Sequence, residues 1–167
     1  MMTNNLRVGH GFDVHRFSEV YDAKKPLRLA GVTVKDKKSL IAHSDGDVVL
    51  HALCDAILGA IAAGDIGQHF PDNDATYAGA DSADLLRQVM QLAAKQRFSL
   101  INVDVTVVAQ VPKLSAYRQQ MLERLAQLLI LPINRVNIKA TTTEGLGYIG
   151  REEGIACHAV VLLGSDA

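Results

Sequence analysis

An α+β fold, a mixed β-sheet with helices on one face, is predicted by the order of hydrophobic patterns along the chain. Strand-like and helix-like segments follow one another without a strict β-α alternation, which favours helices segregated on one side of a sheet. The 167 residues suit one domain, and 49% of them are apolar. Because no repeat or linker divides the sequence, we expect a single domain over residues 1–167.

The predicted elements run as strands, two helices, a strand, a helix and two strands. The strand-like segments cover residues 6–14, 27–34, 100–109, 136–140 and 155–163. The helical segments cover residues 47–63, 82–96 and 115–129. The Gly-, Pro- and Asp-rich stretch 66–79 is expected to be a loop. This order has ferredoxin-like character, and an open sheet face that is not obviously polar is a surface that oligomerisation could cover.

Composition excludes several classes of partner. A net charge of −1 and a pI near 6.6 create no global field for nucleic acid or anionic lipid. Aromatic residues make up 5% and Trp is absent, which disfavours base-stacking modules. No apolar run approaches the roughly 18 residues that span a bilayer, and the start lacks secretory-signal features. We therefore expect a cytoplasmic protein, with Cys54 and Cys157 reduced and buried in apolar stretches.

Asp13 and His15 form the first candidate metal pair. Residues two apart on a strand face the same side, so this carboxylate and imidazole point together. Such a pair suits a borderline cation such as zinc. An exposed strand end that binds nothing is the alternative for this pair alone.

His51 is the second candidate ligand, on the predicted helix 47–63. Asp47, His51 and Asp55 are four residues apart and share one helix face. The apolar neighbours indicate a largely buried helix, in which Asp and His need partners. We expect one flanking carboxylate to orient His51 while its other ring nitrogen binds metal.

Two loops add groups that could hold phosphate or hydroxyls. In 64–72, glycines and a proline fix a tight path, and Asp65 and Asp72 could bind substrate hydroxyls or simply cap turns. In 139–154, consecutive threonines offer hydroxyls and backbone amides that suit phosphate oxygens. Glu144 adds a carboxylate oxygen, the kind of ligand that a phosphate-bridging magnesium ion uses. Lys139 and Arg151 add positive charge, although a Thr-rich segment is usually an ordinary loop.

Five sequence blocks, taken together, resemble one family. They are GHGFDVH (9–15), AHSDGDVVLHALCDA (42–56), GDIGQHFPD (64–72), NVDVTVVAQVPK (102–113) and KATTTEGLGYIGREEGIAC (139–157). In this order, and nearly end to end, they resemble the 2-C-methyl-D-erythritol 2,4-cyclodiphosphate synthase family of the non-mevalonate isoprenoid pathway. The resemblance implies a single catalytic domain with a ferredoxin-like, bacillus chorismate mutase-like sandwich fold.

The resemblance also implies a reaction and its metals. In that phosphorus-oxygen lyase, the 2-phosphate of 4-diphosphocytidyl-2-C-methyl-D-erythritol 2-phosphate attacks the β-phosphate, giving the cyclic diphosphate and CMP. It implies zinc or another divalent metal on Asp13, His15 and His51. It further implies magnesium or manganese on Glu144, bridging the diphosphate. Residues implied to stabilise the transition state are His43 and Thr142.

Substrate contacts follow from the resemblance residue by residue. The methylerythritol phosphate is implied to contact Ser44, Asp65, Ile66, Gly67, Phe70, Pro71, Asp72, Asn73 and Asp74. The cytidine diphosphate pocket is implied to include Ala109, Gln110, Val111, Pro112, Lys113, Leu114, Ser115, Thr141, Thr142 and Thr143. Further substrate-binding positions implied are Tyr148 and Arg151. Ser115 and its neighbours depart from the family's usual pocket edge, and Tyr148 stands where a Phe is frequent.

Assembly is the last implication of the resemblance. Family members are homotrimers with active sites between subunits, and a central cavity lined at Phe12, Arg151 and Glu153 can hold an isoprenoid-like molecule.

Two alternative functions come from other classes of protein. A metal-dependent phosphohydrolase would need carboxylates that the sequence lacks. A non-catalytic nucleotide- or isoprenoid-binding module would not need His43, Lys113 and Glu144 together.

Overall fold

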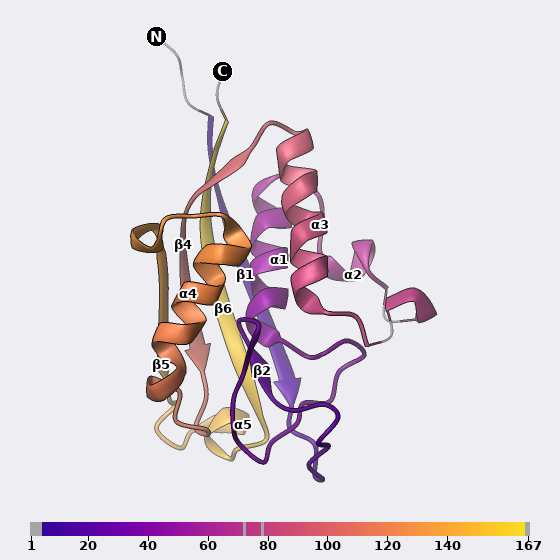
Figure 1. Cartoon of the computed structure of the whole chain (residues 1–167), viewed down its shortest axis with the longest axis vertical. Coiled ribbons are helices and arrows are strands. Elements are labelled where there is room, and N and C mark those ends of the chain that lie inside the picture. Colours follow the sequence, from indigo (N-terminus) through magenta and orange to yellow (C-terminus); the bar gives the residue numbers. More distant parts are fainter. Residues whose placement is uncertain (1–4, 72, 78, 166–167) are drawn as a thin grey trace.

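The computed structural model describes residues 5–71, 73–77 and 79–165. Its main sheet has four strands (Figure 1), in the order β1 (Asn5–Arg16), β6 (Gly154–Ser165), β4 (Ser99–Val108) and β5 (Val136–Thr141). β6 pairs antiparallel with both β1 and β4, whereas β4 and β5 are parallel. The sheet is therefore mixed, as predicted.

Three helices cover one face of this sheet (Figure 1). Helix α1 (Val48–Ala60) packs on β1 and β6, α3 (Ser82–Lys95) lies beside α1, and α4 (Arg118–Leu129) packs on β5. Two short helices, α2 (Ile66–His69) and α5 (Gly147–Gly150), lie within connections. The predicted α+β class with helices on one face is confirmed.

Several predicted boundaries were wrong for local reasons. The helix predicted over 47–63 is shorter because Asp47 caps α1 and Ala62 takes a left-handed φ of 54° before Gly64. The strand predicted over 27–34 is a hairpin of β2 (Arg28–Leu29) and β3 (Val32–Thr33). Ala30 and Gly31 both have positive φ, the conformation that a two-residue hairpin turn requires.

Two other segments also differ from the prediction. The stretch 66–79, expected to be loop, contains α2 and a 3-10 turn at Ala75–Tyr77. The helix expected over 115–129 begins as a 3-10 turn at Ser115–Tyr117, and α4 follows it.

Glycines allow β1 and α1 to touch backbone to backbone. A Cβ at Gly11 would lie 1.9 Å from the carbonyl oxygen of Ala52, and one at Gly9 would lie 1.8 Å from that of Ala56. Since side chains cannot fit there, the strand crosses directly over the helix. This contact brings the C-terminal end of β1 to the first turns of α1.

The sheet face away from the helices divides into an apolar and a polar half. Its apolar half comes from alternate residues of β1 and β6, all exposed: Leu6, Val8, Phe12, Val14 and Val160. On the β4–β5 half, Lys139 forms an ion pair with Asp104, which also accepts a hydrogen bond from Asn137. Among the described residues, no helix is both long and apolar enough to cross a membrane.

Candidate functional site

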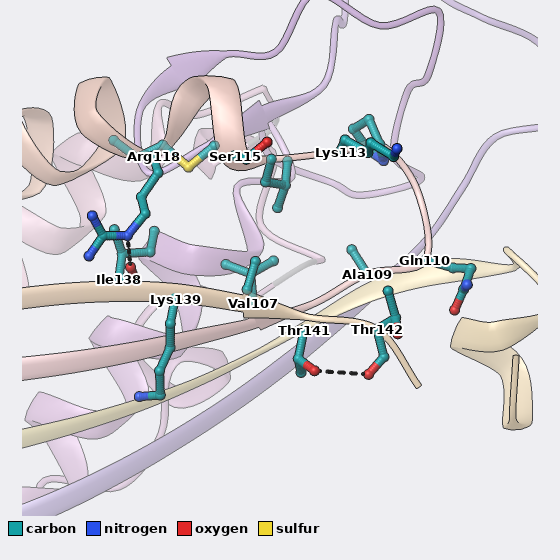
Figure 2. A pocket seen from close by; sticks show the side chains of 14 residues that line it. Val107, Ala109, Gln110, Lys113, Ser115, Arg118, Ile138, Lys139, Thr141 and Thr142 are labelled. Carbon is teal, nitrogen blue, oxygen red and sulfur yellow. Dashed lines mark hydrogen bonds between the residues drawn. The ribbon is translucent and has the colours of Figure 1, made fainter. Parts of the chain in front are cut away.

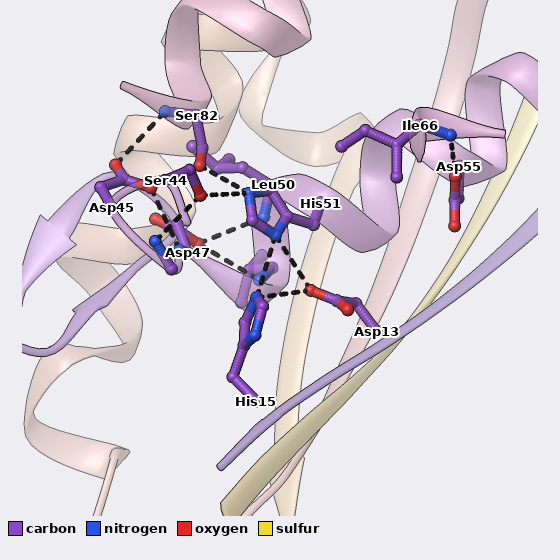
Figure 3. A network of polar contacts seen from close by, with 12 residues as sticks. Asp13, His15, Ser44, Asp45, Asp47, Leu50, His51, Asp55, Ile66 and Ser82 are labelled. Atoms are coloured by element: carbon purple, nitrogen blue, oxygen red, sulfur yellow. Dashed lines mark hydrogen bonds and ion pairs between the residues drawn. The ribbon is translucent and has the colours of Figure 1, made fainter. Parts of the chain in front are cut away.

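Asp13, His15 and His51 converge on one point (Figure 3). Asp13 Oδ2 lies 3.1 Å from His15 Nε2 and 3.0 Å from His51 Nδ1, and the two nitrogens are 3.1 Å apart. Ligand atoms around a tetrahedral zinc ion, with bonds of about 2.0–2.1 Å, are about 3.3 Å from one another. The donor types and their spacing therefore fit a borderline divalent cation.

The electrostatics of the three side chains favour a bound cation. Burial raises the pKa of Asp13, but hydrogen bonds from His15 and His51 outweigh it and hold that pKa well below its usual range. Burial alone would lower the pKa of His51, but the hydrogen bond to Asp13 and the negative charge of Asp13 raise it. The pKa of His51 is therefore above its usual value. The partly buried Asp13 carboxylate is thus held in its charged form, which suits a cation at this point.

His51 is oriented by hydroxyl groups rather than by the carboxylates that we predicted. Its Nε2 lies 2.8 Å from Ser82 Oγ and 3.1 Å from Ser44 Oγ. The prediction that Asp47 or Asp55 orients His51 was wrong. Ser82 was missed because its sequence context, an Asp-Ser pair before an apolar period, signals only a helix start.

Asp47 and Asp55 bind backbone amides instead. The buried Asp47 carboxylate accepts from Val49 and Leu50, as an N-cap, and from the amides of the β2–β3 turn at 30–31. Asp55 accepts from the amide of Ile66 at 2.7 Å. Burial raises the pKa of both carboxyl groups. Their helical spacing matched the prediction, but a cap residue turns its side chain back onto the backbone.

His43 lies on the loop before α1, next to Ser44. It is exposed and lines a cavity of about 510 Å³ together with Lys25, Arg28 and Asp45. Burial lowers the pKa of Lys25. Ser44 also lines this cavity and lies 3.1 Å from His51 Nε2, so His43 is next in the chain to a residue that contacts the Asp-His-His group.

Apart from Ser44, which precedes α1, the predicted methylerythritol-phosphate contacts lie after α1, around α2. Asp65 caps α2 and accepts from the backbone and side-chain amides of Gln68 at 3.0 and 2.8 Å. Phe70 is buried against Tyr77, with ring centroids 5.3 Å apart. Five other predicted residues are half-buried or exposed on this segment: Ile66, Gly67, Pro71, Asn73 and Asp74. Asp72 lies outside the described residues.

A cavity of about 450 Å³ opens between α4 and the C-terminal ends of β4 and β5 (Figure 2). It gathers most residues predicted for the nucleotide pocket: Ala109, Gln110, Pro112, Lys113, Leu114, Ser115, Thr141 and Thr142. Val111 is not among its lining residues. Arg118 also lines the cavity, and its Nε donates to the carbonyl of Ile138 in the cavity wall. No motif in the sequence pointed to this residue.

Three predicted residues lie away from this cavity. Thr143 and Tyr148 line a separate hollow of about 330 Å³ that also includes Phe12 and His158. Arg151 is exposed, and its Nε donates to Glu153 Oε1 at 2.6 Å.

Lys139 is among the residues that line the cavity, but its ammonium group pairs with Asp104 and so does not supply the positive charge that we expected from the segment 139–154. Its side chain turns from the cavity (Figure 2), toward its ion pair with Asp104. Strand alternation explains this result, because residue 139 projects to the opposite face from residue 138.

Thr142 and Glu144 lie together at the end of β5. The Thr142 hydroxyl donates to Glu144 Oε1 at 3.1 Å and accepts from the Glu144 amide at 3.2 Å. Glu144 has a left-handed φ of 52° and an exposed side chain. It is not part of the Asp-His-His group, so one chain carries two separate candidate metal positions.

The two halves of the candidate site lie at opposite edges of the sheet. The Asp-His-His group sits on β1 and its helix α1, whereas the 450 Å³ cavity sits beside β5. Two strands lie between them, a separation of about 14 Å over three strand spacings.

Fold and site together define a class: a small α+β protein with a candidate divalent-metal centre at one sheet edge and a hydroxyl-rimmed cavity at the other. Within that class, the chain belongs to the YgbB family, whose model matches residues 6–164.

Relatives named 2-C-methyl-D-erythritol 2,4-cyclodiphosphate synthase are similar over nearly the whole chain. The protein from Idiomarina loihiensis is 58% identical over 160 residues, covering 96% of this chain and 98% of the relative. The one from Nitrosococcus oceani is 57% identical over 158 residues, covering 95% and 98%.

Solved structures share the fold. A Plasmodium falciparum IspF complex with CDP aligns with a TM-score of 0.84 and 36% identity, covering 99% of both chains. The bifunctional IspDF from Campylobacter jejuni aligns with a TM-score of 0.91 and 47% identity, covering 98% of this chain and 43% of that one.

Proposed function

We propose that this protein converts 4-diphosphocytidyl-2-C-methyl-D-erythritol 2-phosphate to 2-C-methyl-D-erythritol 2,4-cyclodiphosphate and CMP. The family makes the chain an enzyme, a phosphorus-oxygen lyase of isoprenoid biosynthesis. The observation in this chain that carries the proposal is the convergence of Asp13, His15 and His51 on one point. The reaction needs positioning and charge stabilisation more than covalent chemistry from the protein.

The metal positions of the proposal follow the two candidate centres. Asp13, His15 and His51 would hold zinc or another divalent ion, and Glu144 would hold magnesium or manganese. Such ions supply Lewis-acid polarisation of phosphate oxygens when bound. The donor set supports this division, because imidazoles suit zinc and a lone carboxylate suits a phosphate-bridging magnesium ion.

The protein's own groups bind and orient the substrate. Lys113 and the hydroxyls of Thr141 and Thr142 lie where they could hold a diphosphate against the cavity, with cytidine inside it. His43 and Thr142 are proposed to donate hydrogen bonds to charge that develops on the transferred phosphate, for which the Thr142 hydroxyl would turn from Glu144 Oε1 to the substrate. Thr143, Tyr148 and Arg151 stay predictions as substrate contacts.

The methylerythritol phosphate is proposed to lie between Ser44 and the segment 65–74. Both carboxylate oxygens of Asp65 already accept a hydrogen bond from Gln68, which fixes the direction of this side chain. A carboxylate has about four lone-pair sites, so Asp65 retains capacity for a substrate hydroxyl.

A homotrimer would unite the two halves of the site. The β1 edge of one chain would stand against the β5 edge of its neighbour, closing the 14 Å gap that one chain leaves. The apolar half of the open sheet face supports burial against other copies. We also propose that the space enclosed by the three chains, near Phe12, can hold an isoprenoid-like molecule. Sedimentation equilibrium gives the oligomeric mass, and a monomer at assay concentration would contradict the trimer.

Phosphorus NMR of the purified protein with substrate and magnesium tests the reaction. We expect resonances of CMP and of a cyclic diphosphate to appear together. Inorganic phosphate in their place would identify a metal-dependent phosphohydrolase. Unchanged substrate with line broadening would identify a binding module without turnover.

A further inference from the structure

We propose that Ser82 and Asp45 form a relay that positions His51 as a metal ligand through its Nδ1 atom. The relay rests on the proposed metal centre and adds two positioning residues to it. Neither residue belongs to the Asp-His-His group: Ser82 contacts His51 from outside it, and Asp45 contacts Ser82 (Figure 3).

A metal on His51 Nδ1 would determine the direction of each hydrogen bond along the relay. His51 Nδ1 faces Asp13 and His15, so a metal bound there requires the proton to sit on Nε2. That Nε2–H donates to Ser82 Oγ at 2.8 Å. The Ser82 hydroxyl in turn donates to Asp45 Oδ1. A carboxylate at the far end therefore favours the tautomer that leaves Nδ1 available.

Burial makes this chain of hydrogen bonds hard to replace with water. Ser82 is fully buried, and the side chains of His51 and Asp45 are only 11% and 12% exposed. Asp45 Oδ2 accepts the Ser82 amide at 3.3 Å and lies 3.5 Å from the Arg28 guanidinium. Asp45 therefore lies between the Arg28 guanidinium and the Ser82 hydroxyl and anchors the far end of the relay.

The start of α3 explains why the Ser82 hydroxyl is available. Asp81, not Ser82, is the N-cap of α3, and its side chain accepts from the amide of Ala83 at 2.8 Å. The hydroxyl of Ser82 is thus not needed to cap the helix. It points instead at His51, on a different helix.

Ser44 contributes a second hydroxyl but not a second relay. Its Oγ lies 3.1 Å from His51 Nε2 and accepts from the amide of Gly46 at 3.2 Å. Within the described part of the chain, no contact joins the Ser44 hydroxyl to a carboxylate. Ser44 can accept from His51, but only the Ser82 path continues to a charged group.

Metal affinity of the full-length Ser82→Ala protein tests the relay, with zinc in competition with a chromophoric chelator. We expect about 10- to 100-fold weaker binding, the effect typical of outer-shell partners. Asp45→Asn should weaken binding in the same direction. Ser39→Ala is the matched control, because it removes an equally buried hydroxyl that pairs with the backbone of Asp22, and it should bind zinc like the wild type.

A second readout reports the tautomer directly. Nitrogen-15 NMR of the zinc-loaded wild type should show His51 coordinated through Nδ1, with its Nε2–H protected from solvent exchange. In Ser82→Ala that Nε2–H should exchange faster, whereas in Ser39→Ala it should not. A role confined to packing would leave this signal unchanged.

Two outcomes would overturn the relay, and they are distinguishable from failure of the metal centre. Wild-type affinity in Ser82→Ala, or an equal loss in Ser39→Ala, would remove the relay while leaving the centre intact. If His51→Ala bound zinc as tightly as the wild type, the metal centre itself would be wrong, and the relay with it.

Discussion

The rings of His15 and His51 meet edge to face, with centroids 5.2 Å apart and planes inclined at 73°. His15 contributes Nε2 and His51 contributes Nδ1, so a strand residue and a helix residue present opposite ring nitrogens to one place. With Asp13 as the third donor, His51 is thus one of three ligands, and its removal should weaken metal binding.

His51→Ala should lose the metal while the protein stays folded. We expect zinc affinity to fall by more than about 100-fold, because a direct ligand matters more than the outer-shell groups that contribute 10- to 100-fold. Elemental analysis after gel filtration measures the zinc content, and circular dichroism follows the fold. His10→Gln, on the exposed sheet face, is the control. Stoichiometric zinc in His51→Ala would contradict the ligand assignment.

Gly11→Ala should strongly destabilise the protein. The added methyl would overlap the Ala52 carbonyl oxygen and force β1 away from α1, which would also displace Asp13 and His15. Urea denaturation should show a large fall in the free energy of unfolding, together with weaker zinc binding.

Gly59→Ala is the matched glycine substitution. It lies within α1, with only ordinary contact near the added methyl. We expect it to stabilise the protein by roughly 0.5–1 kcal/mol through helix propensity. Equal effects of the two substitutions would refute the close strand–helix contact as the cause.

The ligands of the candidate metal group could be predicted from the sequence, but the residue that orients His51 could not. Alternation along β1 placed Asp13 and His15 on one side, and the helical period placed His51 on a helix, so both halves of the metal group were predictable. The hydrogen-bond partner of His51 could not be predicted from the sequence. Ser82 comes from α3, and only tertiary packing of α3 beside α1 brings its hydroxyl to the ring.

Loop geometry was the other limit of sequence reasoning. The nucleotide cavity was identified by resemblance, and most of its predicted residues line one hollow. Thr143 and Tyr148 line another, because the chain turns sharply at Glu144 and Gly145, which both have positive φ. Backbone reversals of this kind depend on conformations that composition alone does not specify.

Asp47→Ala should destabilise the fold by about 2–4 kcal/mol, from a lost helix cap and newly unsatisfied buried amides. The carboxylate accepts from two amides of α1 and two of the β2–β3 turn, and so joins these elements. Chemical denaturation measures the change. Asp84→Ala, a surface substitution in the first turn of α3, should change stability much less. A similar small effect for both would contradict this role.

Both cysteines should resist thiol reagents in the native protein. Cys54 and Cys157 are fully buried, and burial raises the pKa of each thiol well above its usual value. At pH 8 neither would form much thiolate, the reactive species. Mass spectrometry after brief iodoacetamide treatment should show no label until urea is added. Rapid native labelling would show that the helix–sheet core opens readily.

The placement of the two half-sites at opposite sheet edges has a genetic consequence. In the proposed trimer, each active site draws its metal group from one chain and its cavity from the next. A chain defective only at His51 and a chain defective only at Lys113 would each be inactive alone. Mixed trimers of the two would contain one interface with both halves intact, so the two defective alleles should complement each other in one cell.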